Sequence, residues 1–549
     1  MKKNDIFTVT IEDMSHTGEG IGKVDGFPLF IKDAIIGDVV RAKVMKLKKH
    51  YGFARLMEIV EPSKNRINPP CPIHKACGGC QIQAMAYEAQ LRFKGNLVEN
   101  NLKRIGGFSE DILEKMEPFV GMEEPYRYRN KAQFPVGEKN GRIIAGFYAG
   151  RTHDIMECED CLLGAKENQV ILNTVISHME KYQIAPYDET TGKGLIRHVL
   201  TRTGFTSGEW MVCLVINGDK IPAEQELCDA LREVVPAITS ISVSPNKERN
   251  NVIMGKSYRV LWGEGYIKEI LSGIEYRISP LSFFQVNPVQ TEKLYAKAVE
   301  YANLTGRENV WDLYCGTGSI SLFLAKEAGK VHGVEIIEQA ILDARKNAQI
   351  NGLTNTEFFV GKAEDVFARE VQEVDNPEKI DVVVVDPPRK GCDEKLLRTM
   401  LDMEPDRIVY VSCDSATLAR DLKILCEKDY QIERMQCFDQ FPHTVHVETV
   451  CLLSKLHEAK HHINVKVDMD ELDLTSAEAK ATYKEIEEWV QEHYGFHVTN
   501  LNIAQVKQKH GIIERENYNK PKSENSRQPG CPEEKVKAIE DALRHFQMI

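Results

Sequence analysis

The pattern of apolar and polar positions changes several times along the 549-residue chain. Residues 5–60 hold about five short runs of alternating apolar and polar residues, with glycines at positions 18, 20 and 22 in the first turn. Short strands at this spacing predict a small, OB-like β-barrel. From about 118 to 280, strand-like runs such as WMVCLVIN alternate with helical ones, which predicts a mixed α/β region.

The strands become almost wholly apolar between residues 285 and 458. Runs such as VVVV at 382–385 and IVYVS at 408–412 alternate with helical segments. Apolar strands bounded by helices belong to a sheet that is buried on both faces. We therefore expect a doubly wound, Rossmann-like α/β domain, whose ligands bind beyond the carboxyl ends of its strands.

After about residue 460 the pattern is helical. A capping box at Thr475–Glu478 precedes apolar residues at helical spacing, and the runs NIAQVKQKHG and EEKVKAIEDALRHF follow. The first two helices suit either a helix-turn-helix or a simple helical packing module. We expect four regions: a barrel over 1–61, a cysteine-containing segment with a mixed α/β domain over 62–284, the doubly wound domain over 285–458, and a helical extension over 465–549.

Composition narrows the class of protein. The chain is 42% apolar and 28% charged, which is typical of a globular protein. No apolar run approaches the roughly 18–20 residues that span a membrane, and the N-terminus lacks the apolar stretch of a secretory signal. A cytoplasmic protein without a membrane partner is therefore expected. The net charge of −12 does not by itself indicate a nucleic-acid binder.

Charge is nevertheless uneven along the chain. Residues 41–55 hold six Lys or Arg and no acid, and residues 127–151 hold six with one acid, Glu138. Such stretches are either solvated faces or patches that contact phosphates. If they contact phosphates, they would do so on an otherwise acidic protein.

Five of the 14 cysteines are clustered in two short segments. Cys71, Cys77 and Cys80 lie in PPCPIHKACGGCQ, and Cys158 and Cys161 lie in MECEDCLL. In a reducing compartment such cysteines are thiols, metal ligands or catalysts rather than a disulfide framework.

A glycine-rich loop follows the strand VWDL. Gly316 and Gly318 allow a tight turn, but Ser321 stands where a dinucleotide fingerprint requires a third glycine. Glu335 ends the next strand, where a carboxylate can bind both ribose hydroxyls, and Asp312 is placed to meet a cationic amino group. An adenosine ligand with a short charged tail and no pyrophosphate fits S-adenosylmethionine.

Three polar residues lie at strand ends near this loop. Asp386 follows VVVV, Cys413 lies between a strand and a helix, and Glu448 lies in HVETVCLL. We expect the helix N-terminus to lower the pKa of the Cys413 thiol. Methylation of uracil at carbon 5 requires a thiolate that adds to carbon 6, a base that removes the carbon-5 proton, and a methyl donor. Glu448 could instead form a salt bridge, or bind a metal with His443 and His446.

The motifs VWDLYCGTGSISL, FFQVNP, VVVVDPPRKG, VSCDSATLARDL and HVETVCLLSKL together resemble the class I RNA uracil-5-methyltransferases, and the barrel resembles a TRAM domain, an RNA-binding module. The resemblance implies that Cys413 is the nucleophile and Glu448 the proton-abstracting base. It implies that Gln285, Tyr314, Glu335 and Asp386 line the S-adenosylmethionine site, with Asp386 also towards the uracil.

The cysteine cluster resembles that of the ribosomal-RNA branch, which carries a [4Fe–4S] cluster. The resemblance implies that the ligands are Cys71, Cys77, Cys80 and Cys161, because CLL follows Cys161 as in the family. A zinc site made of Cys77, Cys80, Cys158 and Cys161 stays open, although the two pairs lie farther apart than the roughly 15–20 residues of compact zinc modules.

The function implied is transfer of a methyl group from S-adenosylmethionine to carbon 5 of a uridine in 23S ribosomal RNA. The uridine would be flipped out of its stack and held in a covalent cysteine–uracil intermediate by a monomeric enzyme. A transfer-RNA enzyme is the alternative, disfavoured because by resemblance that branch lacks the barrel and the cluster. A DNA cytosine-5-methyltransferase would place proline before its nucleophile, where this chain has Ser412. An amino-group methyltransferase would need an aromatic residue at Arg389, and a regulator with a vestigial methyltransferase fold would not need Cys413 and Glu448.

Overall fold

The computed structural model describes residues 1–372, 379–427, 429–456, 483–510 and 531–546. The chain divides into two compact units, Met1–His457 and Glu458–Ile549. The predicted capping box at Thr475–Glu478 lies outside the described residues. None of the helices in the described ranges is long and apolar enough to cross a membrane.

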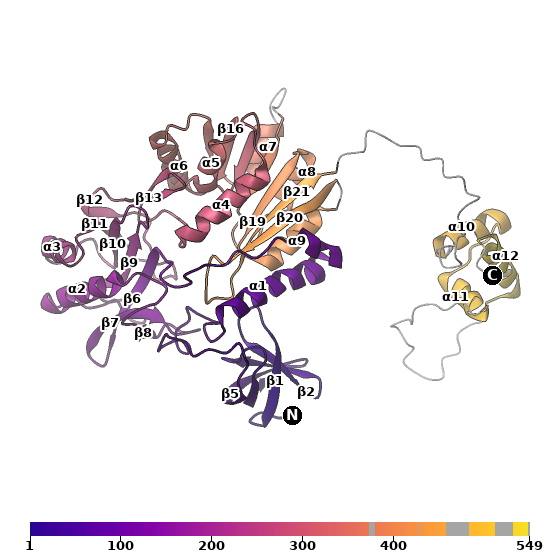
Figure 1. Ribbon diagram of the computed structural model, residues 1–549, viewed down its shortest axis with the longest axis horizontal. Coiled ribbons are helices and arrows are strands. Elements are labelled where there is room, and N and C mark those ends of the chain that lie inside the picture. The colour runs from indigo at the N-terminus through magenta and orange to yellow at the C-terminus, as the bar shows by residue number, and fades with distance from the viewer. Residues whose placement is uncertain (373–378, 428, 457–482, 511–530, 547–549) are drawn as a thin grey trace. The chain divides into compact units, whose positions relative to one another are not determined.

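The N-terminal strands close into the predicted barrel, in the order β1-β2-β3-β5-β4 (Figure 1). Because alternate residues point inward, apolar side chains such as Val9, Ile11, Leu29 and Val40 fill the interior. The strands are β1 (Ile6–Met14), β2 (Gly20–Val24), β3 (Phe27–Lys32), β4 (Val39–Leu47) and β5 (Gly52–Glu61).

The predicted mixed α/β region is a seven-stranded sheet in the order β12-β11-β10-β9-β6-β7-β8. Every residue of β9 and β10 is buried, which explains the continuous apolar character of β10, whereas β9 buries polar residues such as Arg197, His198 and Arg202. The elements are β6 (Lys131–Lys139), β7 (Arg142–Tyr148), β8 (Ile155–Glu157), α2 (Glu167–Lys181), β9 (Ile196–Thr203), β10 (Trp210–Ile216), α3 (Glu224–Val234), β11 (Ile238–Pro245) and β12 (Arg259–Gly263). A hairpin of β13 (Ile267–Leu271) and β14 (Ile274–Ile278) leads out of this region.

The doubly wound domain is a second seven-stranded sheet, in the order β17-β16-β15-β18-β19-β21-β20. Five strands are parallel, and β21 runs antiparallel between β19 and β20. The strands are β15 (Asn309–Leu313), β16 (Lys330–Glu335), β17 (Thr356–Val360), β18 (Val382–Val385), β19 (Arg407–Ser412), β20 (Tyr430–Phe438) and β21 (Glu448–Lys455). The fold is therefore the predicted Rossmann-like one.

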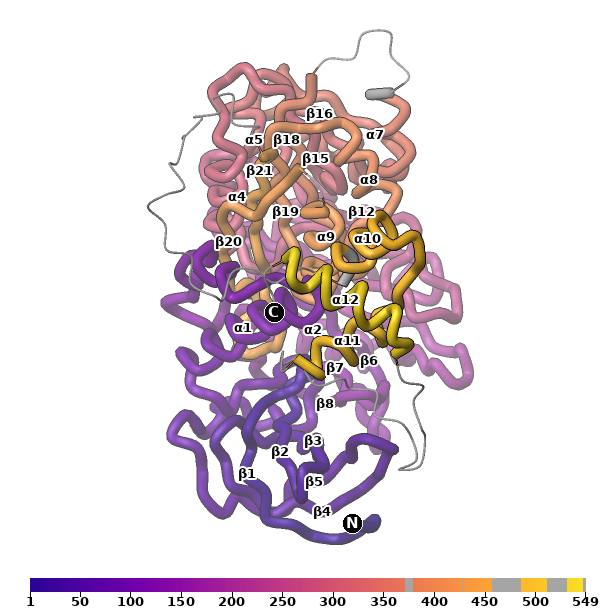
Figure 2. The backbone as a smooth tube through the Cα atoms, turned by 90° about the vertical axis from the view of Figure 1, so that its right-hand side faces the viewer, coloured from indigo at the N-terminus to yellow at the C-terminus, as the bar shows by residue number. Residues whose placement is uncertain are grey.

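Helices cover both faces of this sheet. Consecutive valines of β18 alternate between two apolar clusters, one beneath α4, α5 and α6 and the other beneath α1, α7, α8 and α9. The helices are α1 (Tyr87–Asn101), α4 (Pro288–Ala302), α5 (Ser319–Ala325), α6 (Glu338–Ile350), α7 (Ala363–Gln372), α8 (Glu394–Asp402) and α9 (Ser415–Leu425). In Figure 2 the barrel lies at one end of the first unit and this sheet lies at the other.

The C-terminal unit contains three described helices around a core of its own. They are α10 (Tyr483–Tyr494), α11 (Asn500–Lys509) and α12 (Glu533–His545). Ile486, Val490, Ile503, Val506 and Ile539 are fully or almost fully buried among them. The helical character of this segment is as predicted, and its helix-turn-helix interpretation stays a prediction.

Candidate active site

The candidate residues converge where the strand order of the doubly wound sheet reverses. Chain order runs outward from β15 to β16 and β17 on one side, and from β18 to β19 on the other. Loops after β15 and β18 therefore leave in opposite directions and open a crevice at the carboxyl ends of the strands. The glycine-rich loop that contains Gly316 and Gly318, called the cofactor loop below, follows β15. Asp386 follows β18, and Cys413 follows β19.

The cofactor loop has the backbone that its glycines allow. Gly316 and Gly318 have φ of 56° and 80°, and Tyr314 also has positive φ at 70°. A Cβ on Gly318 would approach Ala344 to 3.2 Å and Phe358 to 3.4 Å, so the start of α5 packs closely against α6 and β17. A left-handed non-glycine residue such as Tyr314 is uncommon and indicates a specialised loop.

Three carboxyl groups lie around this loop, and Asp312 is the one among them that is fully buried by exposed area. Asp312 is fully buried; its Oδ2 accepts a hydrogen bond from Ser321, and its Oδ1 has no partner among the described residues. Burial raises the pKa of Asp312 to about 7, and the charge of Glu335 also raises it. Glu335 ends β16 and accepts a hydrogen bond from the amide of Ile337 through one oxygen, over 2.9 Å. Burial, with the charge of Asp312, raises the pKa of Asp386 to about 7.

Gln285 reaches the same loop from the segment before α4. Its side chain is buried, and its backbone oxygen accepts a hydrogen bond from Asn130 over 3.0 Å. Burial and the charge of Asp386 raise the pKa of Tyr295 in α4, and the nearby side chains of Ser319 and Gln285 lower it. No pattern in the sequence singles out Tyr295, because it follows the apolar spacing of an ordinary helix.

Cys413 and Glu448 lie at the same end of the neighbouring strands β19 and β21, beside the pair Ser412–Thr449. Glu448 is the first residue of β21, pairs with Phe438 of β20, and is 3% exposed. Burial raises its pKa well above the usual range, and the charge of Asp386 adds to this, while Arg389 opposes it. Cys413, Glu448 and Asp386 therefore lie close enough to affect one another's ionisation.

The expected lowering of the Cys413 pKa is wrong. Burial raises the pKa of the thiol to about 12, with further increases from Glu448 and Asp386, and Arg389 opposes them. Two amides at the start of α9 are already hydrogen-bonded, because Asp414 caps the helix. Its carboxylate accepts hydrogen bonds from the amides of Ala416 and Thr417, each over 3.0 Å.

The structure does not support the alternative in which Glu448 binds a metal with His443 and His446. His446 precedes β21 rather than sharing a strand face with Glu448, and His443 stacks on Tyr126 with ring centroids 4.3 Å apart. Across the described residues, no group of three His, Cys, Asp or Glu is arranged to hold a single metal ion.

The two cysteine segments come together. The loop that holds Cys77 and Cys80 is joined to the β7–β8 turn by hydrogen bonds from the Gly78 amide to the Tyr148 oxygen (3.2 Å) and from the Gly150 amide to the Ala76 oxygen (3.0 Å). One cavity of about 520 Å³ is lined by Cys71, Cys77, Cys80, Cys158 and Cys161. The cavity therefore gathers both the four expected cluster ligands and Cys158.

The two basic stretches differ in their surroundings. Lys46, Lys48 and Lys49 are exposed on the barrel. In the stretch 127–151 part of the charge is already paired, and its contact with phosphates stays a prediction. Three of its cations pair with acids, Arg127 with Asp160, Arg142 with Glu157 and Arg151 with Glu19. Lys131 is desolvated, and burial lowers its pKa to about 7.

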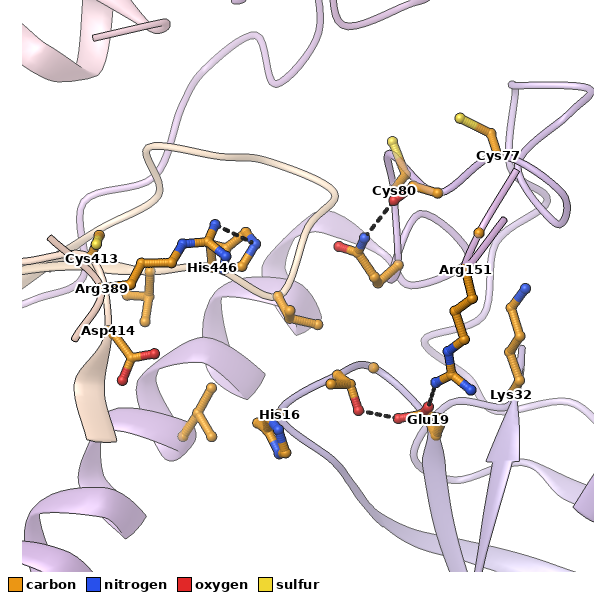
Figure 3. A pocket seen from close by; sticks show the side chains of 18 of the residues that line it. His16, Glu19, Lys32, Cys77, Cys80, Arg151, Arg389, Cys413, Asp414 and His446 are labelled. Carbon is orange, nitrogen blue, oxygen red and sulfur yellow. Dashed lines mark hydrogen bonds and ion pairs between the residues drawn. The ribbon is translucent and has the colours of Figure 1, made fainter. Parts of the chain in front are cut away.

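A cleft of about 1020 Å³ links these parts (Figure 3). Its walls include His16 and Glu19 of the barrel, Arg151 of the β7–β8 turn, and Arg389 and Cys413 of the sheet. Because the barrel and Cys413 border one cleft, a polymer that contacts the barrel can present a residue to the thiol.

The family of the chain follows from comparison with known proteins. A family model described as tRNA (Uracil-5-)-methyltransferase matches residues 227–456, and a TRAM domain model matches residues 2–57. A protein of Halalkalibacterium halodurans, named as an uncharacterised RNA methyltransferase, is 48% identical over 457 residues, 82% of this chain and 98% of that protein. One of Listeria innocua with the same designation is 48% identical over 454 residues, 83% of this chain and 98% of that protein.

A solved structure shares the architecture. The structure of Pyrococcus abyssi tRNA (uracil-54, C5)-methyltransferase in complex with S-adenosyl-L-homocysteine matches with a TM-score of 0.65 and 28% identity, and the match covers 81% of this chain and 100% of that one. With this architecture and the 48% identity to relatives across most of its length, the chain belongs to the RNA uracil-5-methyltransferase family and is an S-adenosylmethionine-dependent RNA methyltransferase.

Proposed function

We propose that this enzyme methylates carbon 5 of a uridine in 23S ribosomal RNA through a covalent bond to Cys413. The observation that supports it most is the proximity of Cys413, Glu448 and Asp386 beside the cofactor loop. A thiol, a carboxyl group of high basicity and a methyl-donor site are the minimal set for this chemistry.

The cofactor fits the residues around the loop. We assign Gln285, Tyr314, Glu335 and Asp386 to the S-adenosylmethionine site, with Glu335 binding the ribose and Asp386 facing both cofactor and uracil. The unpartnered Oδ1 of buried Asp312 is placed for a cationic group. S-adenosylmethionine supplies a methyl group on a positively charged sulfur, and that charge favours the ionised form of nearby acids.

Cys413 and Glu448 would divide the chemistry between them. The Cys413 thiolate attacks carbon 6 of the flipped uracil, and the electron pair moves to carbon 5, which takes the methyl group. Glu448 then removes the proton on carbon 5, the carbon 5–carbon 6 double bond re-forms, and the thiolate leaves. The raised pKa of Glu448 makes its carboxylate a stronger proton acceptor in the last step.

Cys71, Cys77, Cys80 and Cys161 are our candidate ligands for a [4Fe–4S] cluster. Thiolate ligands give such a cluster a negative charge. The cavity that gathers the cysteines suits that charge, because Arg129, Lys131 and Arg389 line it and no Asp or Glu is among the described lining residues. We assign the cluster a structural or RNA-orienting role.

Matched cysteine variants test the cluster. Cys161→Ala should lose the visible absorbance shoulder and most of the iron, whereas Cys158→Ala should keep both. Zinc content in place of iron, with dependence on both Cys158 and Cys161, would instead support the zinc site.

Transfer RNA stays the second candidate substrate, and one observation favours it. The Pyrococcus abyssi enzyme is matched along its whole length by 81% of this chain. Residues 62–457 make up only 396 of the 549 residues, so a match of that extent also takes in residues of the barrel, of the C-terminal unit or of both. The match along the whole length of a transfer-RNA enzyme therefore keeps a transfer-RNA target as the alternative.

Mapping of 5-methyluridine decides between the targets. We expect one or more positions in 23S ribosomal RNA to lose 5-methyluridine when the gene is removed, while transfer RNA is unchanged. Loss confined to transfer RNA would establish the alternative. Target RNA that carries 5-fluorouridine, offered with S-adenosylmethionine, should trap the protein covalently; a catalytically inactive RNA-binding regulator would not be trapped.

We further propose that the enzyme acts as a cytoplasmic monomer. Sedimentation of the purified protein with and without target RNA tests the oligomeric state, and a mass of two chains would contradict it.

A further inference from the structure

Arg389 is the cation that acts on both proposed catalytic residues. It belongs to the turn after β18, and its charge opposes the rise in the pKa of Cys413 and of Glu448. Its side chain is long and exposed. The charge of such a side chain acts at a fixed place only when something holds the guanidinium.

His446 holds this guanidinium. Nη2 of Arg389 donates a hydrogen bond to Nε2 of His446 over 3.1 Å (Figure 3). Among the described residues, the Arg389 guanidinium has no second hydrogen bond and no ion pair. Both side chains line the cleft that contains Cys413.

The imidazole is suited to this role. A guanidinium only donates hydrogen bonds, so Nε2 must accept and the proton must lie on Nδ1 of a neutral ring. Burial lowers the pKa of His446 to about 4; Arg389 and Lys94 also lower it, and Asp414 raises it. The ring meets Phe441 edge-on with centroids 6.1 Å apart, and the His446 amide donates to Oγ1 of Thr444 over 3.3 Å.

We propose that His446 is a positioning residue, which accepts a hydrogen bond from Arg389 and so holds the positive charge where it favours the Cys413 thiolate. The inference deepens the proposed function and rests on it for its meaning in catalysis. It concerns the ionisation of a thiol in the free enzyme, so it can be measured without RNA.

The reactivity of Cys413 towards iodoacetamide tests the proposal. Alkylation of the peptide that contains Cys413 is followed by mass spectrometry between pH 7 and 9 in the full-length protein. We expect His446→Ala to slow alkylation about tenfold, equivalent to a rise of one pKa unit. His446→Gln should retain most of the wild-type rate, because its side-chain oxygen can take the place of Nε2 as acceptor. Cys531 in the C-terminal unit serves as an internal reference.

A double-mutant cycle separates positioning from a general effect on folding. Arg389→Met alone should slow alkylation of Cys413, and adding His446→Ala should slow it no further. The proposal is overturned if His446→Ala leaves the rate unchanged, or slows it equally in the Arg389→Met background. If the His446 effect is found but 5-fluorouridine RNA traps no protein, the positioning role stands and the proposed function fails.

Discussion

Cys413 and Glu448 share an environment that raises the pKa of both. Burial dominates at each residue, and each also feels the neighbouring carboxyl Asp386. Full ionisation of all three groups at once would place three negative charges in one crevice. Ionisation of these groups therefore requires positive charge nearby. Arg389 supplies one such charge, and the sulfonium of the methyl donor would supply another when it is bound.

Removal of the proposed nucleophile should separate binding from catalysis. Cys413→Ala is expected to lower methylation by at least about 10⁴-fold, because no other group can activate carbon 5. S-adenosylmethionine should still bind, since none of its proposed contacts involves Cys413. Methyl transfer and calorimetric titration with the cofactor measure the two effects, and substantial turnover would count against the covalent role.

Removal of the proposed base should arrest the reaction after methyl transfer. In Glu448→Gln the carbon-5 proton has no acceptor, so the bond between Cys413 and carbon 6 persists. We expect a protein–RNA adduct on a denaturing gel when the target RNA and S-adenosylmethionine are present. The double variant Cys413→Ala/Glu448→Gln is the control and should give none; absence of the adduct in the single variant would argue for another base.

At the scale of elements, the barrel contributes an exposed basic edge. Lys46, Lys48 and Lys49 lie around the β4–β5 turn and have no ion pair among the described residues. Arg41 and Lys23 of the same barrel pair with Glu58 and Glu12. Free cations release more counterions on binding RNA than cations that are already paired.

Neutralising the free lysines should weaken RNA binding and its dependence on salt. For Lys46, Lys48 and Lys49 changed together to Gln, we expect the slope of log affinity against log salt to fall by about 2. The variant Lys23→Gln/Arg41→Gln should change the slope less per charge removed. An unchanged slope in the triple variant would show that this edge of the barrel does not contact phosphates.

Helix α1 is held to the loop after β20 by a buried ion pair. Lys94 and Asp439 have fully buried side chains 2.5 Å apart, and Tyr87 also donates a hydrogen bond to Asp439 over 2.8 Å. Nε2 of Gln90 donates a hydrogen bond to Nδ1 of the neighbouring His443 over 3.2 Å. This loop leads directly to His446 and Glu448, so the helix supports the catalytic end of the sheet.

Breaking the Lys94–Asp439 ion pair should lower the free energy of unfolding. Asp439→Ala leaves the Lys94 charge buried without a partner, and we expect it to lower the free energy of unfolding by about 3–5 kcal/mol. Lys94→Met/Asp439→Leu replaces the pair with apolar groups and should recover most of the loss. Urea unfolding followed by tryptophan fluorescence measures both; equal stability of Asp439→Ala and wild type would contradict a structural role for the pair.

At the scale of the whole molecule, the chain is longer than the part of it that its relatives match, and it divides into two compact units. Relatives matched over 98% of their length account for 82% or 83% of this chain. The unit also has its own apolar core in α10, α11 and α12. Both observations indicate that the first unit does not depend on the second for its fold.

Truncation tests that independence. The protein shortened to residues 1–457 should stay folded and keep its methylation rate on target RNA within about twofold, because its site lies wholly in the first unit. Loss of RNA affinity with an unchanged rate at saturation would instead assign the C-terminal unit a role in RNA contact. Gel-shift titration and methyl transfer together distinguish these outcomes.

Much of the architecture could be predicted from the sequence because its signals are local. Alternation in residues 5–60 predicts the barrel, the valines of β18 predict a sheet buried on both faces, and Gly316 and Gly318 mark the cofactor loop. The order of the motifs also predicts the family. The domain boundaries stay predictions, and α1 illustrates why. It precedes the mixed α/β sheet in the chain but packs on α9 of the other one.

What the sequence determined by itself is the set of elements and the residue types at strand ends, because periodicity and turn chemistry depend on neighbours in the chain. Tertiary structure alone decided the raised pKa of Cys413, the pairing of Arg151 with Glu19, and the hydrogen bond from Arg389 to His446. These depend on burial and on partners up to 132 residues away. The N-terminus of α9 was expected to lower the pKa of Cys413, but Asp414 caps that helix and burial raises the pKa of the thiol. The residues next to Cys413 in the chain do not show how deeply its thiol is buried.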